Sequence, residues 1–302
     1  MACLTIKEKL SGVYAPITTP FKNDHILYHG LAKNIQRMNK TGLRGYFVLG
    51  TNGEFKSLSV EEKLLVLKTV VDNAGPDKVV MAGTAAESTK ETIDLTIEAA
   101  RLGASMASLL VPSFFRKYMT DDVLTDYIIE VADASPVPVV LYNNPSVAAD
   151  VLISPEVVKN VADHPNVVGM KDSSKGNFKA YIEAVKGKDF YILAGSAGFF
   201  LDALMAGGVG GVLSLANVFP DECAKLYSMF EAGNIEEAKA LSEKIVALNK
   251  EVSGFRGVAA VKGAMDLLGF VGGAPRRPLK ALTEDEKETL RASLRKHGFI
   301  AD

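Results

Sequence analysis

Few of the residues that build metal centres or disulfide frameworks occur in this chain. Its 302 residues include two cysteines and four histidines. Cys3 and Cys223 lie far apart, and no acidic residue stands with the histidines in a metal-ligand pattern. We therefore expect no disulfide framework and no bound metal. Cysteines left unpaired favour a reducing, cytoplasmic compartment.

Long hydrophobic runs and an excess of one charge are also missing. No apolar stretch is long enough to span a bilayer, and the N-terminal MACLTIKEKLSG lacks the apolar centre of a signal peptide. The net charge of −2 and the pI of about 6.2 favour neither nucleic acid nor an anionic membrane as a partner. With 48% hydrophobic and 23% charged residues, the composition is that of a globular protein with a large core.

The chain alternates short apolar runs with longer amphipathic ones. The short runs are rich in β-branched residues and bounded by Gly, Pro, Ser or Asn, which is typical of buried parallel strands. They lie at residues 12–19, 45–49, 78–84, 104–111, 137–142, 167–171, 191–194 and 210–215. Start signals at Ser59, Ser88 and Ser154-Pro155, and stop signals such as Gly103, delimit helices between them.

Eight strand–helix units at a period of about 30 residues predict an α/β fold, a closed (β/α)₈ TIM barrel. An open doubly wound sheet is the other arrangement of such units, but no G-x-G-x-x-G follows the first strand. From residue 234 onward the apolar spacing is helical, with further helices at 259–269 and 284–297. We expect a barrel domain at residues 1–233 and a C-terminal helical appendage at 234–302 that packs on the barrel.

The catalytic groups of this fold lie at the carboxyl ends of the strands. Lys171 follows the apolar run 166–170, so it stands at the mouth of the barrel, where an unpaired ammonium is rarely buried. A dry mouth favours the neutral amine, which is the form that attacks a carbonyl. Alternatively, Lys171 forms a solvated salt bridge with Asp172, and position alone leaves both interpretations open.

Polar residues at the ends of neighbouring strands are candidate partners of this lysine. Tyr142 ends the fifth strand, where its phenol can relay protons or can simply pack with one hydrogen bond. The turn Gly50-Thr51-Asn52-Gly53 offers N–H groups and a hydroxyl to a carboxylate, unless it is an ordinary turn. No ligand set for a metal-dependent aldolase is present, so an iminium on the lysine is the remaining electron sink. We expect substrate contacts as well from the residues that follow the sixth, seventh and eighth strands, namely Ser173, Gly195 and Asn217.

In their order along the chain, these motifs resemble the dihydrodipicolinate synthase / N-acetylneuraminate lyase superfamily of class I pyruvate-dependent aldolases. The matching segments are residues 12–21, Gly50-Thr-Asn-Gly-Glu54, Tyr142-Asn-Asn-Pro145 and Gly169-Met-Lys-Asp-Ser173. The resemblance implies that Lys171 forms a Schiff base with a 2-keto acid such as pyruvate. It also implies that Tyr142 relays protons with help from Thr51, and that Thr51 and Asn52 hold the substrate carboxylate. A homotetramer arranged as a dimer of dimers, without a metal cofactor, is implied too.

Within the superfamily the sequence resembles the 4-hydroxy-2-oxoglutarate aldolase branch, through T-N-G-E at 51–54 and Arg277-Pro278-Leu279. The implied reaction is the reversible cleavage of a 4-hydroxy-2-keto acid to pyruvate and an aldehyde such as glyoxylate. One alternative is dihydrodipicolinate synthase activity, which condenses pyruvate with aspartate semialdehyde. Val147 stands where that branch carries a carboxylate-binding arginine, which disfavours this activity. Another alternative is a non-catalytic barrel that binds a keto acid, since Phe114 and Phe115 stand where the family has phenols.

Overall fold

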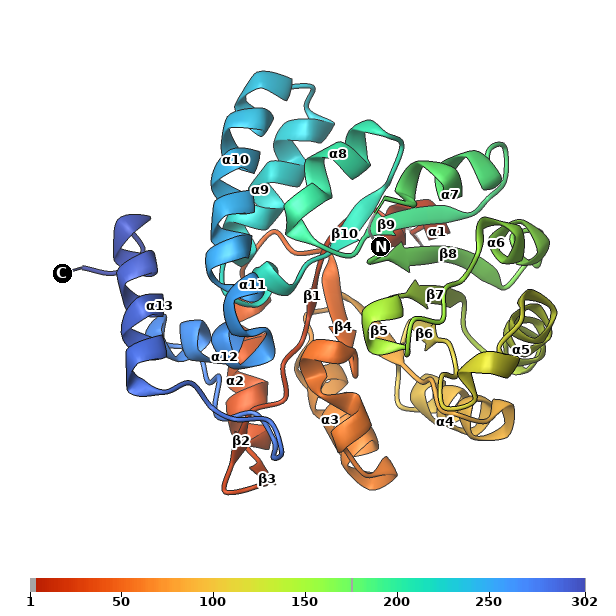
Figure 1. Ribbon diagram of the computed structural model, residues 1–302, viewed down its shortest axis with the longest axis horizontal. Coiled ribbons are helices and arrows are strands. Elements are labelled where there is room, and N and C mark those ends of the chain that lie inside the picture. Colours follow the sequence, from red (N-terminus) through yellow and green to blue (C-terminus); the bar gives the residue numbers. More distant parts are fainter. Residues whose placement is uncertain (1–3, 175, 302) are drawn as a thin grey trace.

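Eight parallel strands close into a barrel in the computed structural model, which describes residues 4–174 and 176–301. Around the barrel the strands follow the order β1-β10-β9-β8-β7-β6-β5-β4 (Figure 1). Their bounds are β1 (Gly12–Pro16), β4 (Gly45–Val48), β5 (Val79–Gly83), β6 (Met106–Leu110), β7 (Val139–Asn143), β8 (Val167–Asp172), β9 (Tyr191–Ala194) and β10 (Gly210–Val212). Each lies in or beside one of the eight apolar runs, so the predicted closed barrel is confirmed.

Helices enclose the barrel and bury its strands on both faces. Every residue of β6, β7 and β8 is buried, which explains why these strands are almost continuously apolar. The enclosing helices are α2 (Tyr28–Met38), α3 (Val60–Asn73), α4 (Thr89–Arg101), α5 (Asp121–Ala134), α6 (Pro155–Val161), α7 (Phe178–Ala184), α8 (Phe200–Met205) and α9 (Pro220–Glu231). At the three predicted starts, the side chains of Ser59, Ser88 and Ser154 each accept a hydrogen bond from the backbone N–H three residues on. These predicted helix starts are confirmed.

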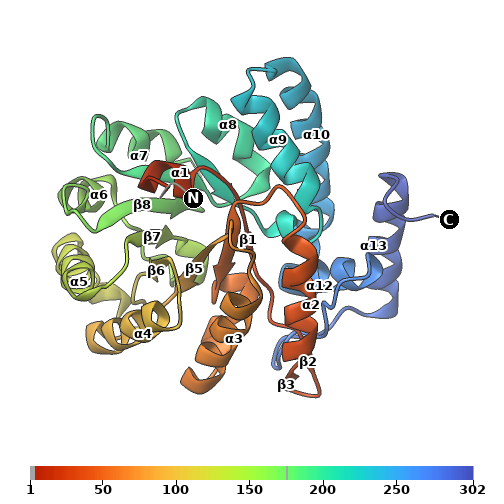
Figure 2. The ribbon, with the colours of Figure 1, turned by 180° about the vertical axis from the view of Figure 1, so that it is seen from behind.

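Two short elements near the N-terminus have no counterpart in the expected pattern. Helix α1 (Ile6–Leu10) begins at a capping box made by Thr5 and Glu8, and it lies on the near face of the barrel in Figure 2. The hairpin of β2 (Phe21–Lys22) and β3 (His25–Ile26) leads from β1 toward α2. Helix α1 has 5 residues and each hairpin strand has 2, which is too short for hydrophobic periodicity to indicate them.

After α9 the chain forms the helical extension, which packs along one side of the barrel (left in Figure 1). Its helices are α10 (Ile235–Glu251), α11 (Ser253–Arg256), α12 (Val258–Leu267) and α13 (Glu284–Lys296). Ile245 and Leu248 of α10 are fully buried, and beyond α12 the residue Ala274 forms a β-bridge with Phe21. The predicted C-terminal helical extension is confirmed, whereas the domain boundary at residue 234 stays a prediction. No helix in the described part of the chain is both long and apolar enough to cross a membrane.

Candidate active site

Lys171 lies near the carboxyl end of β8, beside Tyr142 of β7. The parallel register of the two strands pairs these residues directly. Lys171 is only 5% exposed, and its Nζ lies 3.9 Å from the ring centroid of Tyr142 and 5.1 Å from that of Phe47. Two aromatic rings therefore shield the amine from bulk water. The register between β7 and β8 is sufficient to bring the Tyr142 phenol beside the amine.

Asp172, the next residue of β8, belongs to a different environment, because successive side chains of a strand point to opposite faces. It is fully buried, and its Oδ1 accepts hydrogen bonds from Asn143 Nδ2 at 2.8 Å and from Ser174 Oγ at 2.7 Å. Burial raises the pKa of Asp172 above its ordinary value, although these hydrogen bonds oppose the rise. The solvated salt bridge between Lys171 and Asp172, one of the two interpretations of the sequence, is therefore wrong.

The Tyr142 phenol is held by two hydrogen-bonding neighbours. Its oxygen lies 3.0 Å from Thr51 Oγ1, and it accepts a hydrogen bond from Asn144 Nδ2 at 2.9 Å. Burial alone would raise the pKa of Tyr142, but the charge of Lys171 and the hydrogen bonds of Thr51 and Asn144 bring the pKa below its ordinary value. A phenol that loses its proton more easily than usual, beside an amine, is suited to carrying protons.

The turn after β4 presents Thr51 and Asn52 in the short helix η1 (Thr51–Gly53). Two non-glycine residues with left-handed backbone bracket this turn, Leu49 with φ 63° and Glu54 with φ 54°. Gly50 fits here because a β-carbon at that position would lie 2.6 Å from the Phe47 ring. The conformation of the turn therefore depends on the left-handed backbone of Leu49 and Glu54 and on the missing side chain of Gly50.

These side chains line a cavity of about 370 Å³ at the mouth of the barrel. Six of the seven predicted site residues line it, namely Thr51, Asn52, Tyr142, Lys171, Ser173 and Gly195. Gly195 approaches Ser173 so closely that a β-carbon would lie 2.0 Å from Ser173 Oγ. Asn217 lies outside the lining; it is fully buried and donates to the carbonyls of Pro16 at 2.9 Å and Ser214 at 3.1 Å. This placement fits a residue that supports the cavity wall rather than one that contacts substrate.

The sequence interpretation missed several polar residues of the lining. They are Asn144, Ser146, Ser196, Ser214, Asn249 and Ser253. Asn144 stands in the motif that starts at Tyr142, which was a signal for its role beside the phenol. Asn249 and Ser253 come from α10 and α11, where helical spacing carries no sign of a cavity. The extension therefore forms part of the wall, beyond the packing role expected for it.

Lys171 is the only charged side chain among the described residues that line the cavity; the remaining polar lining consists of hydroxyls and amides. Within residues 4–174 and 176–301 there is also no group of three or more His, Cys, Asp or Glu side chains placed to hold a metal ion. The arrangement can bind a small anion through hydrogen bonds, attack a carbonyl with an amine and exchange protons through a phenol.

The chain is similar to known proteins over almost its whole length. The model of the dihydrodipicolinate synthetase family matches residues 9–297. A probable mitochondrial 4-hydroxy-2-oxoglutarate aldolase of Emericella nidulans is 33% identical, covering 93% of this chain and 92% of its own length. A 4-hydroxy-tetrahydrodipicolinate synthase of Methanothrix thermoacetophila is 34% identical, covering 94% and 96%. The structure of dihydrodipicolinate synthase from Acinetobacter baumannii complexed with pyruvate has a TM-score of 0.90 at 30% identity, covering 96% and 100%.

Proposed function

We propose that this chain, which belongs to the dihydrodipicolinate synthetase family, works through a Schiff base between Lys171 and a 2-keto acid such as pyruvate. Family membership makes the chain an enzyme of the aldolase and lyase class. The observation that best supports the Schiff base is the pairing of Lys171 with Tyr142, with the amine 3.9 Å from the phenol ring. A carbonyl-attacking amine needs a dry pocket and a proton carrier beside it, and this pair provides both.

In the proposed reaction the neutral Lys171 amine attacks the keto carbon of a 4-hydroxy-2-keto acid. Tyr142, held by Thr51, supplies and removes the protons as the carbinolamine loses water and becomes an iminium. Tyr142 then accepts the proton of the 4-hydroxyl while the C3–C4 bond breaks and its electron pair moves toward the iminium, leaving an enamine and a free aldehyde. Protonation of the enamine at C3, followed by hydrolysis, releases pyruvate and regenerates Lys171. No metal or other cofactor enters this scheme.

The turn after β4 is the proposed site of the substrate carboxylate. Thr51 and Asn52 line the cavity there, and the Asn52 amide is fixed by a hydrogen bond to Ser214 Oγ. Ser173, which follows β8, lines the same cavity and is placed to contact the 4-hydroxyl or the far end of the substrate. Gly195 contributes by leaving room for Ser173 rather than by a contact of its own.

The first candidate substrate is 4-hydroxy-2-oxoglutarate, which would yield pyruvate and glyoxylate. Similarity to the Emericella nidulans relative supports this candidate. A second candidate is a 2-keto-3-deoxy sugar acid, whose aldehyde half carries hydroxyls and no charge. The lining contributed by Ser196, Asn249 and Ser253 favours it, because these residues offer hydroxyl and amide partners and no cation for a second carboxylate.

Borohydride trapping tests the Schiff base directly. The protein is incubated with pyruvate, reduced and digested, and we expect one reduced pyruvate adduct on Lys171 by mass spectrometry. Lys171→Arg, verified as folded by circular dichroism, is the control and should carry no adduct. An unmodified Lys171 in folded parent protein would overturn the proposal.

A panel of retro-aldol assays with pyruvate detection separates the alternatives. We expect turnover of a 4-hydroxy-2-keto acid and little turnover of pyruvate with aspartate semialdehyde, since Val147 offers no charge to the second carboxylate. Turnover with the semialdehyde would establish the synthase alternative instead. Pyruvate trapping with no cleavage of any panel member would favour a barrel that binds keto acids without catalysis.

A homotetramer and a cytoplasmic location complete the proposal. The loop after β6 exposes large aromatic side chains, with Phe114 79%, Phe115 64% and Tyr118 72% exposed, which is typical of a surface that another copy covers. Size-exclusion chromatography with light scattering should give the mass of four chains, and Phe114→Asp/Phe115→Asp should lower it. Cell fractionation tests the location.

A further inference from the structure

A buried ion pair between Lys262 of α12 and Glu54 joins the helical extension to the turn after β4. The Lys262 side chain is 0% exposed and that of Glu54 is 2% exposed. Lys262 Nζ also donates to the carbonyl of Ala274 at 2.9 Å. Two charges removed this far from water gain little net stability from each other, because desolvation offsets their attraction. Such a pair is better suited to positioning the segments it joins than to stabilising the fold.

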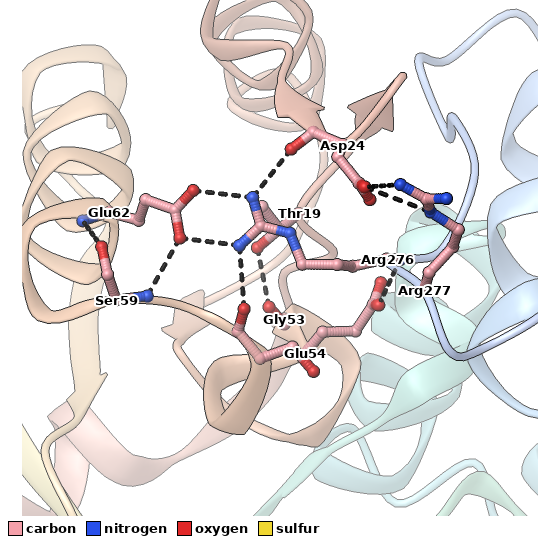
Figure 3. Close-up of polar contacts among 9 residues, drawn as sticks. Thr19, Asp24, Gly53, Glu54, Ser59, Glu62, Arg276 and Arg277 are labelled. Carbon is pink, nitrogen blue, oxygen red and sulfur yellow. Dashed lines mark hydrogen bonds and ion pairs between the residues drawn. The ribbon is translucent and has the colours of Figure 1, made fainter.

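Glu54 ends the turn in a conformation that its residue type does not favour. Its φ of 54° and ψ of 36° are left-handed, and non-glycine residues keep such a backbone only where the surroundings impose it. The extension holds both carboxylate oxygens of Glu54. Oε1 accepts from Lys262, and Oε2 accepts from the backbone N–H of Arg276 at 2.8 Å. Figure 3 shows the Glu54 side chain reaching across to Arg276.

The segment that holds Glu54 is itself fastened to the barrel. The Arg276 guanidinium donates to both carboxylate oxygens of Glu62 on α3, at 2.6 Å each (Figure 3). It donates further to the carbonyls of Ser57 and Asp24, at 2.8 Å each. Bidentate pairing of this kind fixes orientation as well as distance. Arg276, whose N–H holds Glu54, is therefore itself fastened to α3 and to the N-terminal hairpin.

The turn links the position of Glu54 to the Tyr142 phenol through two contacts. The Glu54 N–H donates to the carbonyl of Thr51 at 3.0 Å, which closes the turn. The Thr51 hydroxyl lies 3.0 Å from the hydroxyl of Tyr142. A displacement of Glu54 would accordingly move the hydroxyl that holds the phenol beside Lys171.

We infer that Lys262 is a positioning residue for the reaction, because its ion pair with Glu54 holds the turn in the conformation that brings Thr51 to the Tyr142 phenol. Lys262 is not among the described residues that line the cavity, so it acts through Glu54 and not on the substrate. The inference rests on the proposed function of Tyr142. It means that proton transfer by Tyr142 depends on a residue of the helical extension, outside the barrel.

The test compares Lys262→Met and the double variant Lys262→Met/Glu54→Gln with a matched control, Lys78→Met. Lys78 is also a buried lysine, with a side chain 5% exposed that donates to the carbonyls of Thr41 and Leu43 at the opposite end of the barrel. The double variant leaves no unpaired buried charge, so we expect it to fold even where the single variant is too unstable to measure. In both Lys262 variants the ion pair that holds the turn is gone.

We expect both Lys262 variants to lose about tenfold to a hundredfold in kcat/KM toward the 4-hydroxy-2-keto acid, the loss typical of a misplaced catalytic group. Pyruvate should still be trapped on Lys171, since the amine itself is untouched. Lys78→Met should keep the parent kcat/KM. Parent-level kcat/KM in the folded double variant would overturn the inference and leave the ion pair a purely structural contact.

A readout that needs no turnover separates this inference from the proposed function. Tyrosinate absorbance is titrated for each protein and for its Tyr142→Phe counterpart, and the difference reports Tyr142. Because Thr51 contributes to lowering the pKa of Tyr142, loss of that contact should move the titration to higher pH in the Lys262 variants. An unmoved titration would overturn the inference. Absence of any aldolase activity in the parent would count against the proposed function while the titration still decides the positioning.

Discussion

Two polar clusters lie near the active site, one at the turn after β4 and one around Asp172, and they are built in different ways. The turn cluster joins segments 208 to 214 residues apart through ion pairs, and its members are Glu54, Glu62, Lys262 and Arg276. The strand cluster joins residues 2 to 38 apart through hydrogen bonds, and its members are Asn143, Asp172, Ser174 and Tyr181. The ion pairs of the turn cluster add to backbone contacts that already join the extension to the barrel, such as the β-bridge between Phe21 and Ala274. The hydrogen bonds of the strand cluster join elements that lie close together along the chain.

The strand cluster holds its carboxyl group without a cation among its members. Burial raises the pKa of Asp172, and its Oδ2 has no hydrogen-bond partner among the described residues. Tyr181 donates its phenol proton to the carbonyl of Ile153 at 2.6 Å and accepts from Asn143 at 3.0 Å. Hydrogen bonds alone hold the Asp172 carboxyl group, whereas Glu54 in the turn cluster is paired with Lys262.

The largest effect is expected at the Tyr142 phenol. Tyr142→Phe keeps the ring beside Lys171 and removes the proton carrier, so kcat should fall by about 10²–10⁴-fold, the contribution typical of general acid–base catalysis. Steady-state kinetics with the substrate identified in the panel measure the loss. A variant that keeps more than about a tenth of the parent kcat would show that protons travel by another route.

Breaking the turn cluster should cost more stability than breaking the strand cluster. Lys262→Met leaves Glu54 as a buried charge without its partner, so the free energy of unfolding should fall by about 3–5 kcal/mol. Urea unfolding followed by circular dichroism measures it. Adding Glu54→Gln should recover most of the loss. No recovery in the double variant would mean that the pair stabilises the fold outright.

The matched change in the strand cluster is Tyr181→Phe. It removes one phenol and leaves the Ile153 carbonyl and the Asn143 amide each short of a partner, which costs about 1–3 kcal/mol. The same urea experiment compares it with Lys262→Met. If Tyr181→Phe proved the more destabilising of the two, hydrogen bonds between neighbouring elements would matter as much as the distant ion pairs.

The smallest effect concerns the pH dependence of stability at Asp172. The folded-state pKa of Asp172 lies above the ordinary value of 3.8, so in the interval above 3.8 the folded protein binds more protons than the unfolded chain. Its contribution is therefore most favourable at low pH and is lost as pH rises through that interval. Asp172→Asn does not titrate, so its stability relative to the parent should rise over the same interval. Urea unfolding at several pH values checks this, and a pH-independent difference would contradict it.

The strand-end residues could be found from the sequence because the barrel repeats a simple rule. Each apolar run ends at the mouth, so the residues at or just beyond its end are candidates, and this rule predicts Lys171, Tyr142 and Thr51. The register between β7 and β8 then places Tyr142 directly beside Lys171. Asn217 shows the limit of the rule, since a strand-end residue can turn inward to bond the backbone.

Contacts between distant segments could not be predicted in this way. Asn249 and Ser253 lie on helices whose apolar spacing specifies only which face is buried, and the cavity they meet is formed by other segments. Lys262 lies on α12, in a stretch where an isolated lysine indicates a solvated face. Its partner is 208 residues away, and only the folded chain brings the two charges together.

One wall of the cavity comes from α10 and α11, while the amine and the phenol come from the strands. In the proposed reaction, the groups that break the bond and the residues placed to meet the departing fragment therefore lie in separate stretches of the chain. Substitutions within residues 249–254 are therefore expected to broaden or narrow the substrate range of such an enzyme while leaving Lys171 unchanged. Saturation mutagenesis confined to those few codons is the shortest route to a redesigned catalyst on this scaffold.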